Sequence, residues 1–310
     1  MKISYCDDIG AAAKLWSICF PGDSPDFVHF YMDRVHRERD ALVLRGAEGD
    51  PRAYLGMVPY EMELHGTRVP CSYLSGVCTL PQFRGRGYMI AMMEQALAKM
   101  YQRGDVLSLL IPAKPTLYLK FGYIDCFFLE QKPLPSGKGE GGLVKSSQNL
   151  NRWYELDCRR HFDGFLHRSR EQWQILLEEH VRFERGELWE NEGAYALVSR
   201  FPEKTVVKEC MGEQEAVRSL LCRIGEGVML SPDSQKAFGQ ARVIHAEKAL
   251  VLAEDCFVNV SDPWIPQNNG SFSVRSGQVT REKGGGRPMK IEELTALVMG
   301  GKNYMNLMLN

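Results

Sequence analysis

The sequence lacks an excess of charge of either sign. Its 310 residues include 38 Lys and Arg against 39 Asp and Glu, a formal net charge of −1 at pH 7. Proteins that bind a nucleic-acid backbone or anionic lipids through their overall field need a basic excess, which is missing here. We therefore expect neither a nucleic acid nor a membrane among the partners. A local basic patch and a homo-oligomeric assembly stay open.

Metal-ligand spacings and long apolar runs are also missing. The nine cysteines are scattered, with no CxxC pair and no Cys/His cluster at zinc spacing. The nearest pairs in the sequence, Cys71/Cys78 and Cys6/Cys19, are interpreted as small buried apolar residues. No apolar run approaches the roughly 18 residues that span a bilayer, and the acidic start does not have the character of a secretory signal. These observations predict a cytoplasmic protein that holds no metal.

What is present is the composition of an ordinary globular protein, 44% hydrophobic and 25% charged. The pattern of the first 132 residues indicates a mixed α/β fold. The expected elements are helices at about 7–20 and 25–37, strands at 41–47, 53–64 and 69–80, a helix at 86–102, a strand at 106–113, a short helix at 115–121 and a strand at 123–132.

The remainder of the chain is divided by a segment rich in Pro and Gly, 133–142, interpreted as a linker or exposed loop. After it, a helical pattern covers about 149–180, with strands at 186–191 and 194–201 and a helix near 212–224. A third segment begins near 241 and closes with a helix at about 291–300. The sequence thus predicts three domains, at 1–135, 148–238 and 239–310.

One stretch carries a chemical signal. In "GVCTLPQFRGRGYMIAMMEQALAKM", residues 76–100, a strand is followed by an Arg/Gly turn and then by a helix. The first amides of a helix have no partner within the helix and point outward, so such a turn favours an anion, here a phosphate or pyrophosphate. A Walker loop is absent, and Ile90 stands where a Rossmann turn needs its third glycine. The alternative is a solvated turn that merely opens a surface helix.

The spacing Gln82-x-x-Gly85-x-Gly87 resembles the pyrophosphate loop of the GNAT acyl-CoA N-acyltransferases, and the order of elements over residues 1–132 resembles theirs as well. The resemblance implies an α/β fold with a mixed sheet and acetyl-CoA as co-substrate. It implies that the loop holds the pyrophosphate and that the strand before it pairs with the pantetheine arm. The implied loop residues are Arg84, Gly85, Arg86, Gly87 and Tyr88, and the strand residues are Val77, Cys78 and Thr79.

The resemblance also implies a proton donor for the departing thiolate. In the family pattern this is a tyrosine on the short helix after the fifth strand, and Tyr118 in "PTLYLKFGY" stands at that place. The alternatives are Tyr123, at the start of a strand, and a purely structural Tyr118. Many family members have an asparagine in the segment filled here by residues 113–116, a departure that puts the pantetheine contact there in question.

The whole chain is similar to the enhanced-intracellular-survival-type acetyltransferases, through "LWSICFPGD", "YLSGVCTLPQFRGRGYM", "YLKFGY" and the ending "LTALVMGGKNYMNLMLN". The likeness implies a catalytic GNAT domain, a degenerate second GNAT-like domain and a small sterol-carrier-like C-terminal domain. It also implies that the α-carboxylate of Asn310 acts as the base for the amine, the alternative being a tail that only packs on its own domain. The glycines in "CRIGEGV", 222–228, are expected to end a helix rather than to bind an anion.

The expected activity is acetyl transfer from acetyl-CoA to a primary amine of a small cationic molecule or peptide, by direct attack through a tetrahedral intermediate. A non-catalytic acyl-CoA sensor or scaffold is the alternative, and lipid binding by the C-terminal domain is a third. The acidic and aromatic segment 20–31 would suit a cationic acceptor, although an ordinary amphipathic helix pair has the same pattern. The candidate acceptor residues are Asp26, Phe27 and Tyr31.

Overall fold

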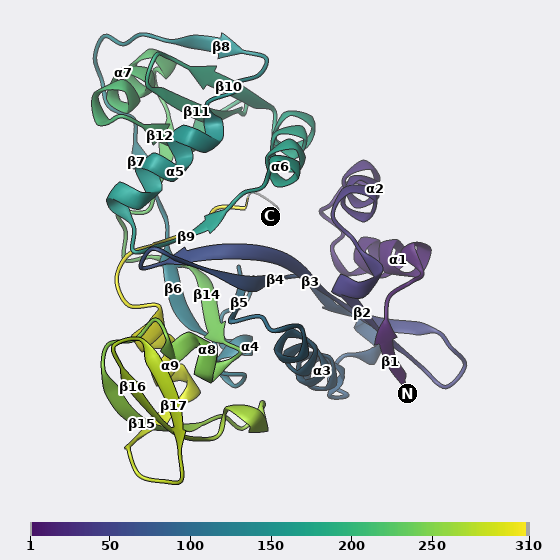
Figure 1. Cartoon of the computed structure of the whole chain (residues 1–310). Coiled ribbons are helices and arrows are strands. Elements are labelled where there is room, and N and C mark those ends of the chain that lie inside the picture. The colour runs from purple at the N-terminus through teal and green to yellow at the C-terminus, as the bar shows by residue number, and fades with distance from the viewer. Residues whose placement is uncertain (1, 308–310) are drawn as a thin grey trace. The chain divides into compact units, whose positions relative to one another are not determined.

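The computed structural model describes residues 2–307 and has a mixed α/β fold with two compact units (Figure 1). The first unit comprises the described residues as far as Met62 together with Thr67–Ile124 and Gly239–Gly300. The second comprises Glu63–Gly66, Asp125–Phe238 and the described residues from Gly301. The N-terminal and C-terminal segments of the sequence therefore share the first unit.

The N-terminal part of the first unit follows the expected order, preceded by one additional strand. Asp8 caps the first helix by accepting a hydrogen bond from the Ala11 amide at 2.9 Å, and Ser24 caps the second through the Phe27 amide at 3.1 Å. The elements are β1 (Lys2–Tyr5), α1 (Ile9–Cys19), α2 (Pro25–Arg34), η1 (Glu38–Asp40), β2 (Ala41–Arg45), β3 (Pro51–Leu64), β4 (Thr67–Thr79), η2 (Pro81–Phe83), α3 (Tyr88–Arg103), β5 (Leu107–Leu110) and α4 (Thr116–Leu119). The next strand, β6 (Ile124–Phe128), belongs to the second unit from Asp125 onward.

The C-terminal part of this unit adds a strand to the N-terminal sheet, which runs β1-β2-β3-β4-β5-β14. Strand β14 pairs antiparallel with β5, with Arg242 opposite Ser108 and Val243 opposite Leu107. A separate sheet has the order β17-β16-β15-β18. The elements are β14 (Ala237–Val243), α8 (Ala246–Leu250), β15 (Cys256–Ser261), η3 (Pro266–Asn268), β16 (Gly270–Arg275), β17 (Gln278–Glu282), β18 (Arg287–Lys290) and α9 (Ile291–Val298).

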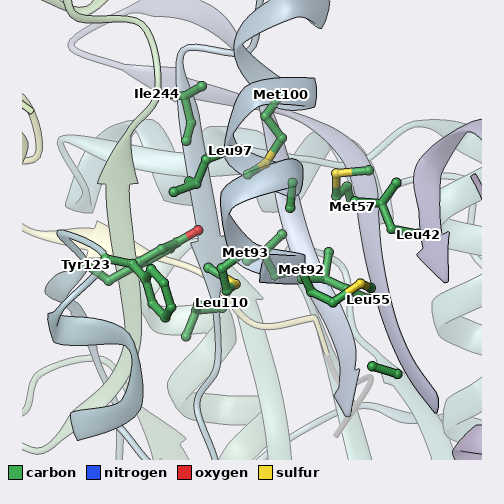
Figure 2. Packing of buried hydrophobic residues seen from close by; sticks show 14 of the residues in the cluster. Leu42, Leu55, Met57, Met92, Met93, Leu97, Met100, Leu110, Tyr123 and Ile244 are labelled. Atoms are coloured by element: carbon green, nitrogen blue, oxygen red, sulfur yellow. The ribbon is translucent and has the colours of Figure 1, made fainter. Parts of the chain in front are cut away.

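Helix α3 supplies much of the core of the first unit. Its apolar residues recur every three or four positions, which places Met93, Leu97 and Met100 on one buried face. Figure 2 shows this face among side chains of the sheet, including Leu55 and Leu110. The C-terminal segment contributes Ile244 and Ile265 to the same cluster. Because α3 is held along its length, the position of its N-terminus is fixed.

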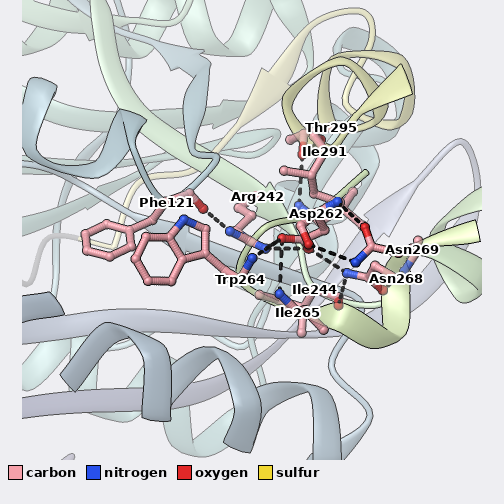
Figure 3. A network of polar contacts seen from close by, with 12 residues as sticks. Phe121, Arg242, Ile244, Asp262, Trp264, Ile265, Asn268, Asn269, Ile291 and Thr295 are labelled. Carbon is pink, nitrogen blue, oxygen red and sulfur yellow. Dashed lines mark hydrogen bonds and ion pairs between the residues drawn. The ribbon is translucent and has the colours of Figure 1, made fainter. Parts of the chain in front are cut away.

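A buried ion pair ties the C-terminal segment to the residues after α4 (Figure 3). The Arg242 guanidinium binds both carboxylate oxygens of Asp262, at 2.7 and 2.6 Å, and donates to the Phe121 carbonyl. The Asn268 amide donates to Asp262 at 2.9 Å, and the Trp264 ring donates to the Lys120 carbonyl at 2.7 Å. Because the charges are paired and fully buried, the C-terminal segment is an integral part of this unit.

The second unit contains a six-stranded sheet in the order β7-β13-β12-β11-β10-β8 and helices packed with it. Near the end of the described chain, β19 (Asn303–Tyr304) runs parallel to β6 and β9. The other elements are β7 (Glu130–Pro133), β8 (Gly142–Val144), α5 (Leu150–His161), β9 (Gly164–His167), α6 (Arg170–Phe183), β10 (Gly186–Glu190), β11 (Ala194–Arg200), β12 (Thr205–Gly212), α7 (Gln214–Ile224) and β13 (Val228–Ser231).

The local patterns predicted the second unit less well than the first. The expected helical stretch at 149–180 is two helices, α5 and α6, separated by the short strand β9. Strand β12 was missed, although its half-buried sequence TVVKECMG is rich in strand-forming residues. The segment 133–142 is a loop with a strand at each end, and the amide of Glu140 in it donates to Ser219 of α7 at 2.9 Å. The three domain boundaries stay a prediction.

Candidate active site

The Arg/Gly turn lies between a strand and a helix, as expected. Strand β4 ends at Thr79, the short turn η2 follows, and Gly87 is the N-cap of α3. Gly85 and Gly87 have left-handed φ angles of 75° and 78°, which residues with a Cβ adopt at a cost. A Cβ at either position would meet nothing within 4 Å. The glycines are therefore required for the path of the backbone and leave open space beside it.

That open space is part of a cavity of about 560 Å³ in the first unit. The residues that line it come from α1, β3, β4, the loop after β4, the first turn of α3 and the short helix α4. They are Cys19, Phe20, Tyr54, Val77, Cys78, Thr79, Phe83, Arg84, Gly85, Gly87, Tyr88, Met89, Ile90, Met92, Leu117, Tyr118 and Lys120.

The basic side chains that line the cavity have no acidic counterpart among Asp and Glu. They are Arg84 and Lys120, both cationic. The Arg84 side chain is fixed by donating from Nε to the Thr79 carbonyl at 3.2 Å. The first amides of α3 add the partial positive charge of a helix N-terminus. An anionic ligand of phosphate type would find complementary charge here without an opposing carboxylate among the lining residues.

The loop differs in detail from the expected set of anion contacts. The Arg84 amide donates to the Pro81 carbonyl at 3.3 Å, so the turn η2 already uses it. The Arg86 side chain is exposed and lies outside the cavity lining, with its guanidinium 5.5 Å from the centre of the Phe83 ring. Tyr88 does line the cavity, and its hydroxyl accepts a hydrogen bond from Arg52 at 3.1 Å.

The strand before the loop extends beyond its parallel neighbour. Strand β4 pairs with β5 at Cys71–Leu107, Ser72–Ser108 and Tyr73–Leu109, and then runs on to Thr79, whereas β5 ends at Leu110. Val77, Cys78 and Thr79 lie in this extension and line the cavity. Backbone groups of a strand that has left its neighbour can accept an extended ligand as an additional strand.

Of the two tyrosines considered as proton donors, only Tyr118 lines the cavity. It is half-buried on α4, and burial raises the pKa of its hydroxyl to about 12. Tyr123 is fully buried, and its hydroxyl forms a 2.6 Å hydrogen bond with Ser108. The two rings pack edge to face with centroids 6.0 Å apart. Of these two, Tyr118 is thus the tyrosine with access to a ligand in the cavity.

The three candidate acceptor residues lie on α2 and outside the cavity lining. Asp26 is exposed in the first turn, and Phe27 is half-buried. Tyr31 is buried, with its hydroxyl donating to Ser75 at 2.7 Å and its ring 4.3 Å from that of Trp16. In this structure Tyr31 holds α2 against the sheet, whereas Asp26 and Phe27 are accessible.

Several cavity residues were missed by the sequence reasoning. Cys19 was expected to be a small buried apolar residue, Phe20 only the first residue of the acceptor segment 20–31, and Tyr54 only part of a strand. No local pattern marks them, because they reach the cavity through tertiary packing. Lys120 could have been found, since it is a cation two residues after Tyr118.

The described end of the chain is docked in the second unit, where Asn303–Leu307 are buried. Asn310 lies outside the described residues, and its role stays a prediction. The glycines of "CRIGEGV" do end a helix: Gly225 caps the C-terminus of α7, and β13 follows. Within residues 2–307, no group of three His, Cys, Asp or Glu side chains is placed to hold a metal ion. None of the helices described is long and apolar enough to cross a bilayer.

Comparison with known proteins agrees with this arrangement. Residues 5–124 match the acetyltransferase (GNAT) domain, and residues 235–309 match the sterol carrier protein domain. A segment of 125 residues is 32% identical to an uncharacterized N-acetyltransferase of Streptomyces avermitilis, covering 36% of this chain and 30% of that relative. The chain therefore matches less than a third of the relative's length.

Solved structures match over nearly the whole chain. Eis1 from Mycobacterium abscessus has a TM-score of 0.77 at 16% identity, covering 97% of this chain and 90% of that one. A GCN5-related N-acetyltransferase from Anabaena variabilis has a TM-score of 0.80 at 19% identity, covering 96% and 90%. At such identities the likeness concerns the fold. Together with the two domain matches, it shows a GNAT acetyltransferase domain at residues 5–124, a sterol-carrier-type domain at residues 235–309 and a fold like that of these solved proteins.

Proposed function

We propose that this acetyltransferase transfers acetyl from acetyl-CoA to a primary amine of a small cationic molecule or peptide. The observation that carries the proposal is the cavity itself. It joins the left-handed glycine loop at the start of α3, two cationic side chains and the Tyr118 hydroxyl in one space. A sensor that only binds acyl-CoA would need the loop and the cations but no proton donor.

The cofactor fits the residues present. The pyrophosphate would be held by the amides from Gly85 to Tyr88 and by Arg84, with Arg86 contributing from the rim. The pantetheine arm would pair with the backbone of Val77, Cys78 and Thr79. The open space beside both glycines is what a bulky anion requires, because no side chain occupies it.

The chemistry needs a neutral amine, a stabilised oxyanion and a proton for the departing thiolate. The amine attacks the thioester carbonyl and forms a tetrahedral intermediate, whose collapse breaks the C–S bond. Tyr118 gives its proton to the sulfur, and burial keeps its hydroxyl protonated at neutral pH. The α-carboxylate of Asn310 is the base that we propose for the amine.

The acceptor side is proposed to be bordered by Asp26 and Phe27, with Tyr31 supporting their helix. An exposed carboxylate beside an aromatic ring suits a cationic amine, through charge attraction and cation–π contact. The location proposed is the cytoplasm, where acetyl-CoA is available and cysteines stay reduced. None of the nine cysteines, all of which are described, forms a disulfide.

The test is release of free CoA thiol from acetyl-CoA in the presence of polyamines, aminoglycosides or lysine-containing peptides. Amine-dependent release, with acetylated amine found by mass spectrometry, would support the proposal. Binding of acetyl-CoA without turnover on any amine in the panel would favour the sensor instead. Matched neutral amides of the same compounds serve as controls, since they cannot be acetylated at nitrogen under these conditions.

A further inference from the structure

Two cysteines that are far apart in the sequence meet in the wall of the cavity. Cys19 is the last residue of α1, and Cys78 is the penultimate residue of β4. Both are half-buried, both line the cavity, and their side chains are hydrogen-bonded to each other. The cavity thus contains a pair of adjacent, accessible thiols, which the proposed acetyl transfer does not use.

The packing of α1 on β4 fixes this pair. Gly76, with a φ of 61°, lets the Trp16 ring approach the strand so closely that a Cβ there would be 2.4 Å from it. The Trp16 ring is held in turn by Asp23, which accepts from its Nε1 at 2.6 Å. Cys19 is three residues after Trp16 on a helix, and Cys78 is two after Gly76 on a strand. Cys19 therefore projects on the same face of the helix as Trp16. The contact brings the end of α1 beside the end of β4, where both cysteines line the cavity.

The electrostatic surroundings make the two thiols unequal. The hydrogen bond from the Cys78 thiol and the nearby Arg84 guanidinium lower the pKa of Cys19 to about 7. The same hydrogen bond, together with burial, raises the pKa of Cys78. Cys19 is thus substantially a thiolate at neutral pH beside a protonated partner. By contrast, burial raises the pKa of Cys6 to about 11. A thiolate next to a second thiol is the arrangement of redox-active cysteines.

We propose that Cys19 and Cys78 form a redox-active dithiol whose oxidant is a hydroperoxide. The Cys19 sulfur attacks the O–O bond, an S–O bond forms, and the leaving oxygen takes a proton to give water or an alcohol. The sulfur of Cys78 then attacks that of Cys19, an S–S bond forms, and the sulfenic oxygen departs as water with the thiol proton. Two electrons pass from the two thiols to the peroxide, and thiol–disulfide exchange with a small dithiol restores them.

One consequence rests on the proposed function. If acetyl-CoA lies along Val77, Cys78 and Thr79, it covers the dithiol, and bound acetyl-CoA should slow its oxidation. The dithiol would then be oxidised readily when the co-substrate site is empty and slowly when acetyl-CoA is bound. The chemistry of the pair itself needs only the packing of α1 on β4.

The first experiment treats the reduced protein with a slight excess of hydrogen peroxide, blocks the remaining thiols and maps the peptides. We expect a Cys19–Cys78 disulfide in the wild-type protein that dithiothreitol reverses. In Cys78→Ser, a sulfenic acid on Cys19 should be trapped by a 1,3-dione, and in Cys19→Ser the Cys78 thiol should stay reduced. Cys256→Ser is the control, because this half-buried cysteine lies on β15 outside the cavity.

The rate of alkylation at pH 7 gives a second measure that needs no substitution. Cys19 of the wild-type protein should react about tenfold faster than Cys256, because burial raises the pKa of Cys256 and keeps it a thiol. Absence of the Cys19–Cys78 peptide, or a Cys19 no faster than Cys256, would overturn the dithiol.

The second experiment repeats the oxidation with saturating acetyl-CoA, which has no free thiol. Slower disulfide formation would support the consequence for the co-substrate site. An unchanged rate, in a protein that calorimetry shows to be saturated, would place acetyl-CoA elsewhere and leave the dithiol standing. If the disulfide does not form even without acetyl-CoA, the proposal of a redox-active dithiol is overturned. The proposed transferase activity is not affected by that result.

Discussion

The guanidinium of Arg168 and the carboxylate of Glu209 form a bidentate ion pair in the interior of the second unit, with N–O distances of 2.7 and 2.8 Å. Two tyrosine hydroxyls, those of Tyr195 and Tyr304, also donate to this carboxylate at 2.7 Å each. Arg168 in addition donates to the Asn306 carbonyl at 2.6 Å. The two buried charges therefore compensate each other, and the network holds Tyr304 and Asn306 in the second unit.

This network predicts different effects for its two tyrosines. Tyr304→Phe and Tyr195→Phe each remove one hydrogen bond to the carboxylate and should each lower the free energy of unfolding by about 1.5–3 kcal/mol. Only Tyr304 belongs to the tail, so only its loss should speed trimming by carboxypeptidase under native conditions. Equal trimming of the two variants would show that the hydroxyl of Tyr304 does not retain the tail.

The glycine loop can be tested with two substitutions of equal size. Gly87→Asn and Gly87→Asp impose similar strain at the left-handed N-cap of α3, and they differ in charge. The aspartate should weaken acetyl-CoA binding at least about tenfold more than the asparagine, or about 1.4 kcal/mol, as measured by calorimetry. Equal affinities of the two folded variants would contradict an anion site at this loop.

Tyr118→Phe keeps the ring and removes the proposed proton donor. We expect kcat to fall by about 10²–10⁴-fold, with little change in acetyl-CoA affinity, because general acid catalysis is lost. Tyr123→Phe is the matched control, since its hydroxyl is bonded to Ser108 inside the core, and it should change stability more than turnover. A Tyr118→Phe enzyme within about threefold of wild-type kcat, with chemistry rate-limiting, would make Tyr118 structural.

The proposed base at the chain's end is tested by a short C-terminal extension with glycines. The extension moves the α-carboxylate away from Asn310 and keeps every side chain, so acetyl-CoA binding should persist while turnover falls about tenfold or more. Deletion of residues 308–310 should act in the same direction. A fully active extended protein would exclude the carboxylate as base and leave the tail a packing role.

Glu179 predicts a pH dependence of stability. It is buried on α6, and burial, followed by the charge of Glu184, raises its pKa from the usual 4.5 to about 9, although Lys208 opposes the shift. Between these two values the folded protein holds a proton that the unfolded chain has released. The contribution of Glu179 to the free energy of unfolding is therefore most favourable below about pH 4.5. It decreases as the pH rises toward 9.

The Glu179→Gln variant has no proton to lose, so its unfolding temperature should exceed that of the wild type increasingly from pH 5 to pH 9. A shift of even one or two pKa units corresponds to about 1–3 kcal/mol. Glu178→Gln, one residue earlier and paired with Arg182 at the surface, is the control and should show no such divergence. Parallel curves for wild type and Glu179→Gln would mean that the carboxyl is ionised in the fold.

The sequence by itself determined those features of the candidate site that depend on local secondary structure. Asp8 and Ser24 mark helix starts, the apolar positions of 88–103 fix one face of α3, and Gly85 and Gly87 permit the turn before it. These features act over a few residues, so the pattern of one segment suffices to predict them. The glycine loop and Tyr118 are therefore recognisable from their own segments of the sequence.

Only the tertiary structure decided which distant residues share a space. Strand β14 enters the N-terminal sheet, Arg242 reaches Asp262 and the carbonyl of Phe121, and Cys19 meets Cys78 across the Trp16–Gly76 contact. The short strand β9 divides a continuous helical pattern because its partner, β19, lies far along the chain. Pairings of this kind depend on contacts between segments remote in sequence, and the composition of neither segment specifies its partner.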